Sequence, residues 1–118
     1  RPFAPSILRE EVSEWFERDD DSPYMNVVMN FKEEKKSKVP AVVHRDGTAR
    51  IQIVDQKLNK KYYNLIQKFQ ELSGYGLLLN TSLNIQEPIC FNSEDSIKLF
   101  LKSEIDVLCI ENYVIQRN

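Results

Sequence analysis

The sequence is poor in cysteine and has no long hydrophobic run. Its 118 residues include two cysteines, Cys90 and Cys109, whose spacing matches no zinc-binding or redox motif. We therefore expect both to be buried free thiols, which suits a reducing cytoplasm. No apolar segment approaches the roughly 20 residues that a membrane-spanning helix needs, and the first residues lack the pattern of a signal peptide. These absences predict a cytoplasmic protein without a membrane partner.

The chain also lacks a strong excess of charge and the common catalytic motifs. Its 16 Lys and Arg residues nearly balance 18 Asp and Glu residues, which gives a net charge of −2. Because such a chain has no bulk attraction for nucleic acid, any anion-binding site must be local. The lysine-rich segment 32–39 contains no interleaved aromatics, so we expect a solvated loop there and no nucleic-acid partner. The sequence has no glycine-rich phosphate loop or nucleophile elbow, and its single histidine has no metal-ligand spacing, so we expect no metal site.

What is present is the hydrophobic periodicity of a mixed α/β domain, in which helices pack on a twisted sheet. An apolar stripe with helical spacing predicts a helix over residues 6–17; its members are Leu8, Val12, Trp15 and Phe16. The other expected helices cover residues 59–73, ending at Gly74, and 94–103, capped by Ser93. The expected strands lie in segments 24–31, 40–54, 76–79, 105–110 and 113–115. Core positions are expected for Trp15, Tyr62 and Phe69.

Segment 40–54 is expected to form a hairpin, and its register decides which side chains share a face. A two-residue loop at Asp46-Gly47 would mix polar and apolar residues on both faces. A three-residue loop, residues 45–47 with Gly47 in the left-handed conformation, separates polar from apolar side chains better. One face then carries Ala41, Val43, Ala49, Ile51 and Ile53, and the other carries Val42, His44, Thr48, Arg50 and Gln52. We favour this register because side chains alternate along a half-buried strand.

The polar side of this hairpin suggests an anion site. Arg50, flanked by His44 and Thr48, would form a cradle for a phosphate, which arginine grips with two parallel hydrogen bonds. The alternative is a surface arginine beside a carboxylate such as Asp46.

A second polar segment follows the expected strand 76–79. Ser82 and Asn84, at positions i and i+2 of an extended segment, point the same way and could hold a phosphate or carbonyl oxygen. The alternative is a loop that is stapled by its own Asn and Ser side chains.

Three motifs occur in order along the chain: Arg-Pro-Phe-Ala-Pro-Ser at 1–6, His-x-Asp-Gly-Thr-Ala-Arg at 44–50 and Leu-Leu-Asn-Thr-Ser-x-Asn at 78–84. Together with the Glu-Pro-Ile that follows at 87–89, they make the sequence resemble the C-terminal domain of the nodulation-protein/antibiotic O-carbamoyltransferase family. The resemblance covers essentially the whole chain. It implies a fold similar to YrdC, an α/β nucleotide-binding domain with a twisted mixed sheet. It also implies that residues 1–118 belong to a longer two-domain enzyme, which the lack of an initiator Met at Arg1 also suggests.

The resemblance implies a division of labour as well. The YrdC-like part would form carbamoyl-adenylate from ATP and carbamoyl phosphate, with Mg²⁺ accompanying the ATP. A preceding actin-like domain, which could also bind a metal, would pass the carbamoyl group to a hydroxyl acceptor. The 118-residue chain alone is therefore expected to be inactive.

The family pattern also assigns roles to individual residues. The Ser-x-Asn pair of YrdC-type proteins looks like Ser82 and Asn84, which would orient a phosphate or the carbamoyl group. Arg1 and Arg50 would clamp phosphates, and His44 would bridge to ribose or phosphate. Further binding residues would be Thr48, Asn80 and Thr81, while the catalytic set is Arg50, Ser82 and Asn84.

The sequence departs from the family pattern in two places. Leu83 stands where family members often have Phe, and the loop before Glu87 is one residue shorter because a common Gly is missing. The Lys-x-Arg partner of the Ser-x-Asn pair would fall upstream of Arg1. Two other functions stay open: a non-catalytic nucleotide-binding or inter-domain module, and threonylcarbamoyl-adenylate synthesis, against which the Arg-Pro-Phe-Ala-Pro opening argues.

Overall fold

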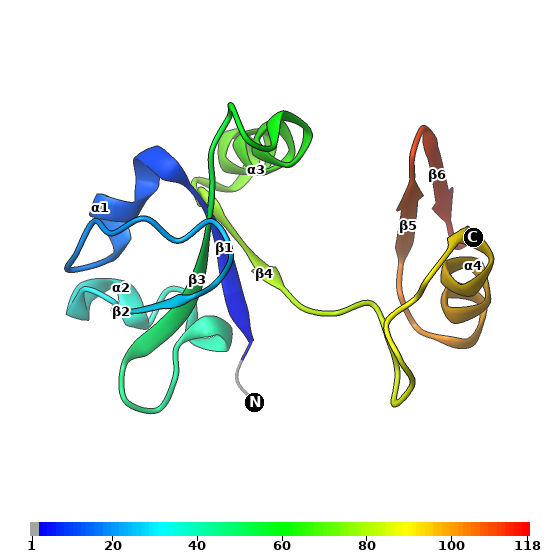
Figure 1. Ribbon diagram of the computed structural model, residues 1–118, viewed down its shortest axis with the longest axis horizontal. Helices are drawn as coiled ribbons and strands as arrows, with labels where there is room; N and C mark the ends of the chain where they lie inside the picture. The colour runs from blue at the N-terminus through cyan, green and yellow to red at the C-terminus, as the bar shows by residue number, and fades with distance from the viewer. Residues whose placement is uncertain (1–2) are drawn as a thin grey trace. The chain divides into compact units, whose positions relative to one another are not determined.

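The computed structural model describes residues 3–118, so Arg1 lies outside the described residues. The chain divides into two compact units, which are drawn in Figure 1. The first, here called the sheet unit, runs to Thr81, and the second, the C-terminal unit, runs from Ser82 to Asn118. No helix among the described residues is long and apolar enough to cross a membrane.

The sheet unit is built on a four-stranded sheet with the order β2-β3-β1-β4. Its strands are β1 (Ala4–Leu8), β2 (Val27–Asn30), β3 (Thr48–Val54) and β4 (Leu77–Asn80). β1 lies parallel to β3, while β2 is antiparallel to β3 and β4 is antiparallel to β1. This mixed sheet confirms the predicted α/β class.

The first element of the described residues is a strand, β1, so the helix expected over 6–17 was wrong for residues 6–8. All five residues of β1 are buried, because the strand lies between β3 and β4. A strand buried on both faces shows no alternation in its sequence, and this one was therefore read as part of a helical stripe. Residues 9–15 of the expected helix are helical, as the 3-10 helix η1 (Arg9–Glu11) and the short helix α1 (Val12–Trp15).

The expected hairpin was wrong in its first strand but correct in its turn. A 3-10 helix, η2 (Pro40–Val42), replaces that strand, and β2 occupies the edge of β3 instead. Proline lacks the N–H group that a ladder needs, which disfavours a strand there. The turn has the predicted three-residue loop: the His44 N–H donates to the Thr48 carbonyl at 2.8 Å, and Gly47 is left-handed with φ 83°.

The lysine-rich segment before it is not wholly a loop. It contains a single helical turn, α2 (Glu33–Lys36), with acidic residues first and basic residues last. That order favours a helix because it complements the helix dipole.

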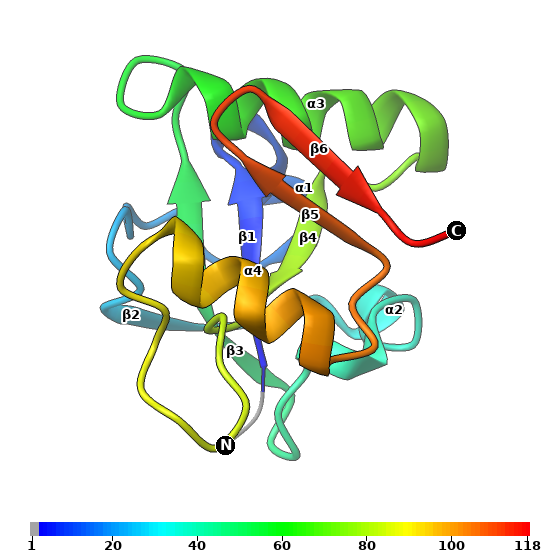
Figure 2. The same ribbon diagram turned by 90° about the vertical axis from the view of Figure 1, so that its right-hand side faces the viewer.

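The two faces of the sheet are covered differently. Figure 1 shows α1 and α2 on one side and α3 (Lys60–Ser73) on the other. The α1 side holds the larger core, whose members include Ile7, Val12, Trp15, Phe16, Phe31, Ala49, Ile51, Ile53 and Leu77. On the other side, α3 runs across one end of the sheet (Figure 2) and packs Tyr63 and Ile66 against Leu8 and Val54.

Helix α3 begins and ends as its sequence predicts. Asn59 caps its first turn, and Gly74, left-handed with φ 81°, ends it. Its apolar stripe is only partly buried, however: Tyr62 is half-buried and Phe69 is 38% exposed, so Phe69 is not the core residue we expected.

The C-terminal unit consists of α4 (Ser93–Lys102) and a hairpin of β5 (Val107–Ile110) and β6 (Tyr113–Gln116). Helix α4 is capped by Asn92, one residue before the expected Ser93. Arg117 donates hydrogen bonds to the carbonyls of Phe100 and Ser103 at the helix end. Both cysteines are free, but Cys90 is only half-buried and Cys109 is exposed, so the expectation of buried thiols was wrong.

Candidate functional site

One face of the sheet unit is polar and open beyond the reach of α3. Helix α3 packs on Leu8, Val54 and Leu78, near one end of the strands. Toward the other end, the outward-pointing residues of three strands form a surface that we call the polar face; its polar members are Asn30, Thr48, Arg50, Gln52 and Asn80, and the exposed Val28 lies opposite Arg50 on β2. The alternating burial along β3, with Ala49, Ile51 and Ile53 turned inward, confirms the predicted face assignment for this strand. Val42, which was expected on the polar side, is instead buried in the core with Ala49 and Ile51, because η2 replaces the expected first strand.

Arg50 is the one cation of the polar face. Its side chain is exposed, and within residues 3–118 it forms no ion pair. The carboxylate of Asp46, considered above as its neighbour, instead accepts hydrogen bonds from the backbone N–H of Thr48 at 3.1 Å and from its hydroxyl at 2.7 Å. These two bonds hold the pKa of Asp46 below its ordinary value. The Arg50 guanidinium is therefore available to an anionic ligand.

His44 belongs to the same turn and is oriented by Thr48. The Thr48 hydroxyl lies 3.1 Å from His44 Nδ1. Since this hydroxyl gives its single proton to Asp46, it can only accept from the ring, which places the histidine proton on Nδ1. Nε2 is buried and has no hydrogen-bond partner among the described residues. The ring thus braces the turn that leads into β3 and Arg50.

A second hydrogen-bond network ties the polar face together across three strands. Ser6 Oγ on β1 and Asn80 Nδ2 on β4 both donate to Gln52 Oε1 on β3, each at 2.9 Å. Ser6 is fully buried beneath this contact. Sequence reasoning placed Gln52 on the polar side of β3 but missed this network, because it depends on which strands are neighbours.

Ser82 and Asn84 lie in the C-terminal unit, directly after Thr81, which is exposed. The Ser82 hydroxyl donates to Asn84 Oδ1, and the Asn84 N–H donates to the Ser82 carbonyl at 3.2 Å, so the segment turns tightly at Leu83 and is not extended as expected. The Asn84 amide nitrogen donates to the Glu87 carbonyl at 2.7 Å. The loop is therefore stapled by its own side chains, as the alternative interpretation has it. Asn84 also lines a cavity of about 280 Å³ whose rim includes Lys98 and Lys102.

The structure brings some of the expected site residues together. Thr48, Arg50 and Asn80 share the polar face, and His44 supports it from the adjoining turn. Ser82 and Asn84 belong to the other unit, so their convergence with Arg50 on one ligand stays a prediction. Among residues 3–118, no three metal-ligating side chains cluster.

Comparison with known proteins identifies relatives along the whole chain. A family model described as Carbamoyltransferase C-terminus matches residues 1–117. An uncharacterized protein of Synechocystis is 38% identical over 99% of this chain and 22% of its own length. The nodulation proteins NolNO of Sinorhizobium fredii and NolO of Bradyrhizobium diazoefficiens are both 40% identical over 99% of this chain, covering 18% and 22% of their own lengths. The chain thus spans about a fifth of these relatives.

Proposed function

The chain belongs to the carbamoyltransferase C-terminus family, and from this premise we propose that it binds ATP and carbamoyl phosphate as part of an O-carbamoyltransferase. The observation that carries the proposal is Arg50: an exposed guanidinium without an ion pair among the described residues, set in a face whose other members are all uncharged. Such a face attracts a phosphate without a competing carboxylate. It also leaves the bidentate geometry of arginine free for phosphate oxygens.

The proposed reaction is the formation of carbamoyl-adenylate. Water would first cleave carbamoyl phosphate to carbamate and phosphate. A carbamate oxygen would then attack the α-phosphorus of ATP, forming the new P–O bond as pyrophosphate leaves. The acceptor hydroxyl would finally attack the carbamoyl carbon and release AMP.

This chemistry needs positioning and charge neutralisation more than a side-chain nucleophile. Arg50 would hold the α-phosphate, and the Asn80 amide would add a neutral contact beside it. Thr48, whose hydroxyl proton is given to Asp46, would hold the adjoining turn in place. Arg1 would be a second clamp, with His44 fixing the turn or meeting the ribose. Ser82, Asn84 and Thr81 would orient the carbamoyl group.

Mg²⁺ would enter with the ATP. The polar face contains no carboxylate, and the Asp46 side chain is already bonded to Thr48. The residues therefore suit an ion held mainly by phosphate oxygens and water, which is the coordination that Mg²⁺ prefers with nucleotides. The acceptor site and the transfer step would lie in a preceding actin-like domain of the longer protein.

One observation favours a second function, a nucleotide-binding module without catalysis. Ser82 and Asn84 bond to each other and to the backbone of their own loop, which leaves them fewer groups for substrate.

A single assay separates the two functions. Full-length protein would be incubated with ATP, Mg²⁺ and carbamoyl phosphate, and pyrophosphate release would be measured. The enzyme should release pyrophosphate only when carbamoyl phosphate is present. Tight ATP binding without pyrophosphate release under any condition would support the non-catalytic nucleotide-binding module and would rule out carbamoyl-adenylate formation.

A further inference from the structure

Next to the polar face, the sheet unit has a pocket of about 220 Å³. It lies where the loop before β2, the end of β3 and the start of α3 meet. Its apolar walls come from Pro23, Tyr24 and Leu58, and its polar groups come from Gln52, Asp55 and Asn59. Apolar walls with a few convergent polar groups are typical of sites for small organic ligands.

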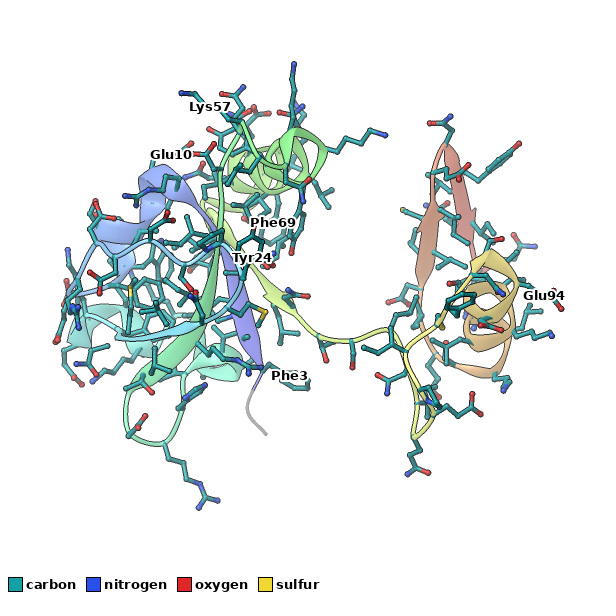
Figure 3. The ribbon with its side chains drawn as sticks, in the orientation of Figure 1. Phe3, Glu10, Tyr24, Lys57, Phe69 and Glu94 are labelled. Atoms are coloured by element: carbon teal, nitrogen blue, oxygen red, sulfur yellow. The ribbon has the colours of Figure 1, made fainter. Side chains whose placement is uncertain are left out.

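Tyr24 is an aromatic ring held in an exposed position. The ring is 84% exposed, and its hydroxyl has no hydrogen bond to a described residue. Its loop is nevertheless fixed to β3, because the buried Ser22 donates to the Ile51 carbonyl at 3.0 Å and accepts from the Ile53 N–H at 2.8 Å. Met25 beside it is left-handed, with φ 59°, a conformation that side chains rarely adopt unless their surroundings fix it. The tyrosine, labelled in Figure 3, is therefore presented by an anchored loop and contributes nothing to the core.

Gln52 gives the pocket an oriented hydrogen-bond donor. Its carboxamide oxygen accepts from both Ser6 and Asn80, so the amide cannot rotate without losing two bonds. The opposite end, the amino group, is not buried and has no partner among the described residues. Two N–H groups are thus directed by the protein and left for a ligand.

We propose that Tyr24 and Gln52 determine the specificity of this site for a nucleobase, a planar aromatic ring with hydrogen-bond acceptors on its edge. The nucleobase stacks on the Tyr24 ring, and an acceptor atom on the edge of the base receives a hydrogen bond from the Gln52 amino group. The inference rests on the proposed function in one respect: Arg50 holds the phosphates of the same nucleotide. Arg50 and Gln52 lie two residues apart on one face of β3, a spacing of about 6.6 Å along the strand. One strand thereby presents a phosphate contact and a base contact side by side.

The test uses full-length protein and two ligands, ATP and inorganic tripolyphosphate, with binding measured by calorimetry. Tyr24→Ala should weaken ATP binding at least about fivefold, since stacking on a base is worth about 1–3 kcal/mol and 1.4 kcal/mol is tenfold. It should leave tripolyphosphate binding unchanged, because that ligand has no base. Tyr24→Phe keeps the ring and should bind ATP like the wild type. Tyr113→Ala is the matched control, because this tyrosine of the C-terminal unit is also exposed, at 73%.

Gln52→Glu tests the donor without breaking the network. A glutamate can still accept from Ser6 and Asn80, but it presents an oxygen where the amino group was, so ATP binding should fall by about tenfold or more. Two outcomes would overturn the nucleobase site but leave the proposed function standing. One is an equal loss of ATP binding in Tyr24→Ala and Tyr113→Ala. The other is no loss of ATP binding in Tyr24→Ala while Arg50→Ala weakens the binding of both ATP and tripolyphosphate. If neither ATP nor tripolyphosphate binds the wild type, the proposed function fails and the pocket assignment with it.

Discussion

Replacing Arg50 by alanine should remove a phosphate contact and little else. The side chain is exposed and makes no ion pair within residues 3–118, so its loss should change the free energy of unfolding by less than about 0.5 kcal/mol. A charge-assisted hydrogen bond to a phosphate is worth about 1.5–3 kcal/mol. We therefore expect ATP affinity in the full-length protein to fall by about tenfold to a hundredfold, since 1.4 kcal/mol corresponds to tenfold. Arg50→Lys should recover little, because a point charge does not replace the planar fork.

The assay pairs ATP titration with a thermal melt. Arg45→Ala is the matched control, because Arg45 is exposed on the neighbouring turn and carries the same charge. If the effect were only one of net charge, the two alanine variants would weaken ATP binding equally. Normal ATP affinity in Arg50→Ala together with a lowered melting temperature would show that Arg50 is a structural residue and not a phosphate contact.

Two further predictions concern the turn that carries the site. Gly47→Ala should destabilise the protein by about 1–2 kcal/mol in urea unfolding, because φ is 83° there; an unchanged midpoint would mean that the turn relaxes. Asp46 has a pKa lowered in the folded state by its bonds to Thr48, so its stabilising contribution should be present above its ordinary pKa of 3.8 and lost as pH falls below it. Unfolding measured between pH 2 and pH 6 should show a weaker acid dependence for Asp46→Asn than for the wild type, and identical curves would contradict the assignment.

The features that were predicted correctly are the ones fixed by local physics. Helix α3 follows from its 3.6-residue period and from Gly74, which can adopt a left-handed conformation. The turn at Gly47 and the alternation along β3 follow from glycine geometry and the two-residue period of strands. Thr48 and Arg50 could therefore be placed on one face before the structure was known.

The features that were missed depend on which segments become neighbours. Residues 6–8 of β1 were expected in a helix because the burial of this strand comes from pairing with β3 and β4, which lie far along the chain. The bond between Ser6 and Gln52 joins residues 46 positions apart, and only the parallel register of β1 and β3 brings them together. Tyr24 gives no periodic signal at all, because its position depends on a loop anchored by Ser22.

A crystal structure of the full-length protein with a non-hydrolysable ATP analogue and Mg²⁺ would show whether Arg50 binds the phosphates of ATP. We expect two guanidinium nitrogens of Arg50 at about 2.7–2.9 Å from phosphate oxygens, and we expect Ser82 and Asn84 to reach the same ligand. An analogue bound elsewhere, with Arg50 paired to a carboxylate of the longer chain, would contradict this expectation.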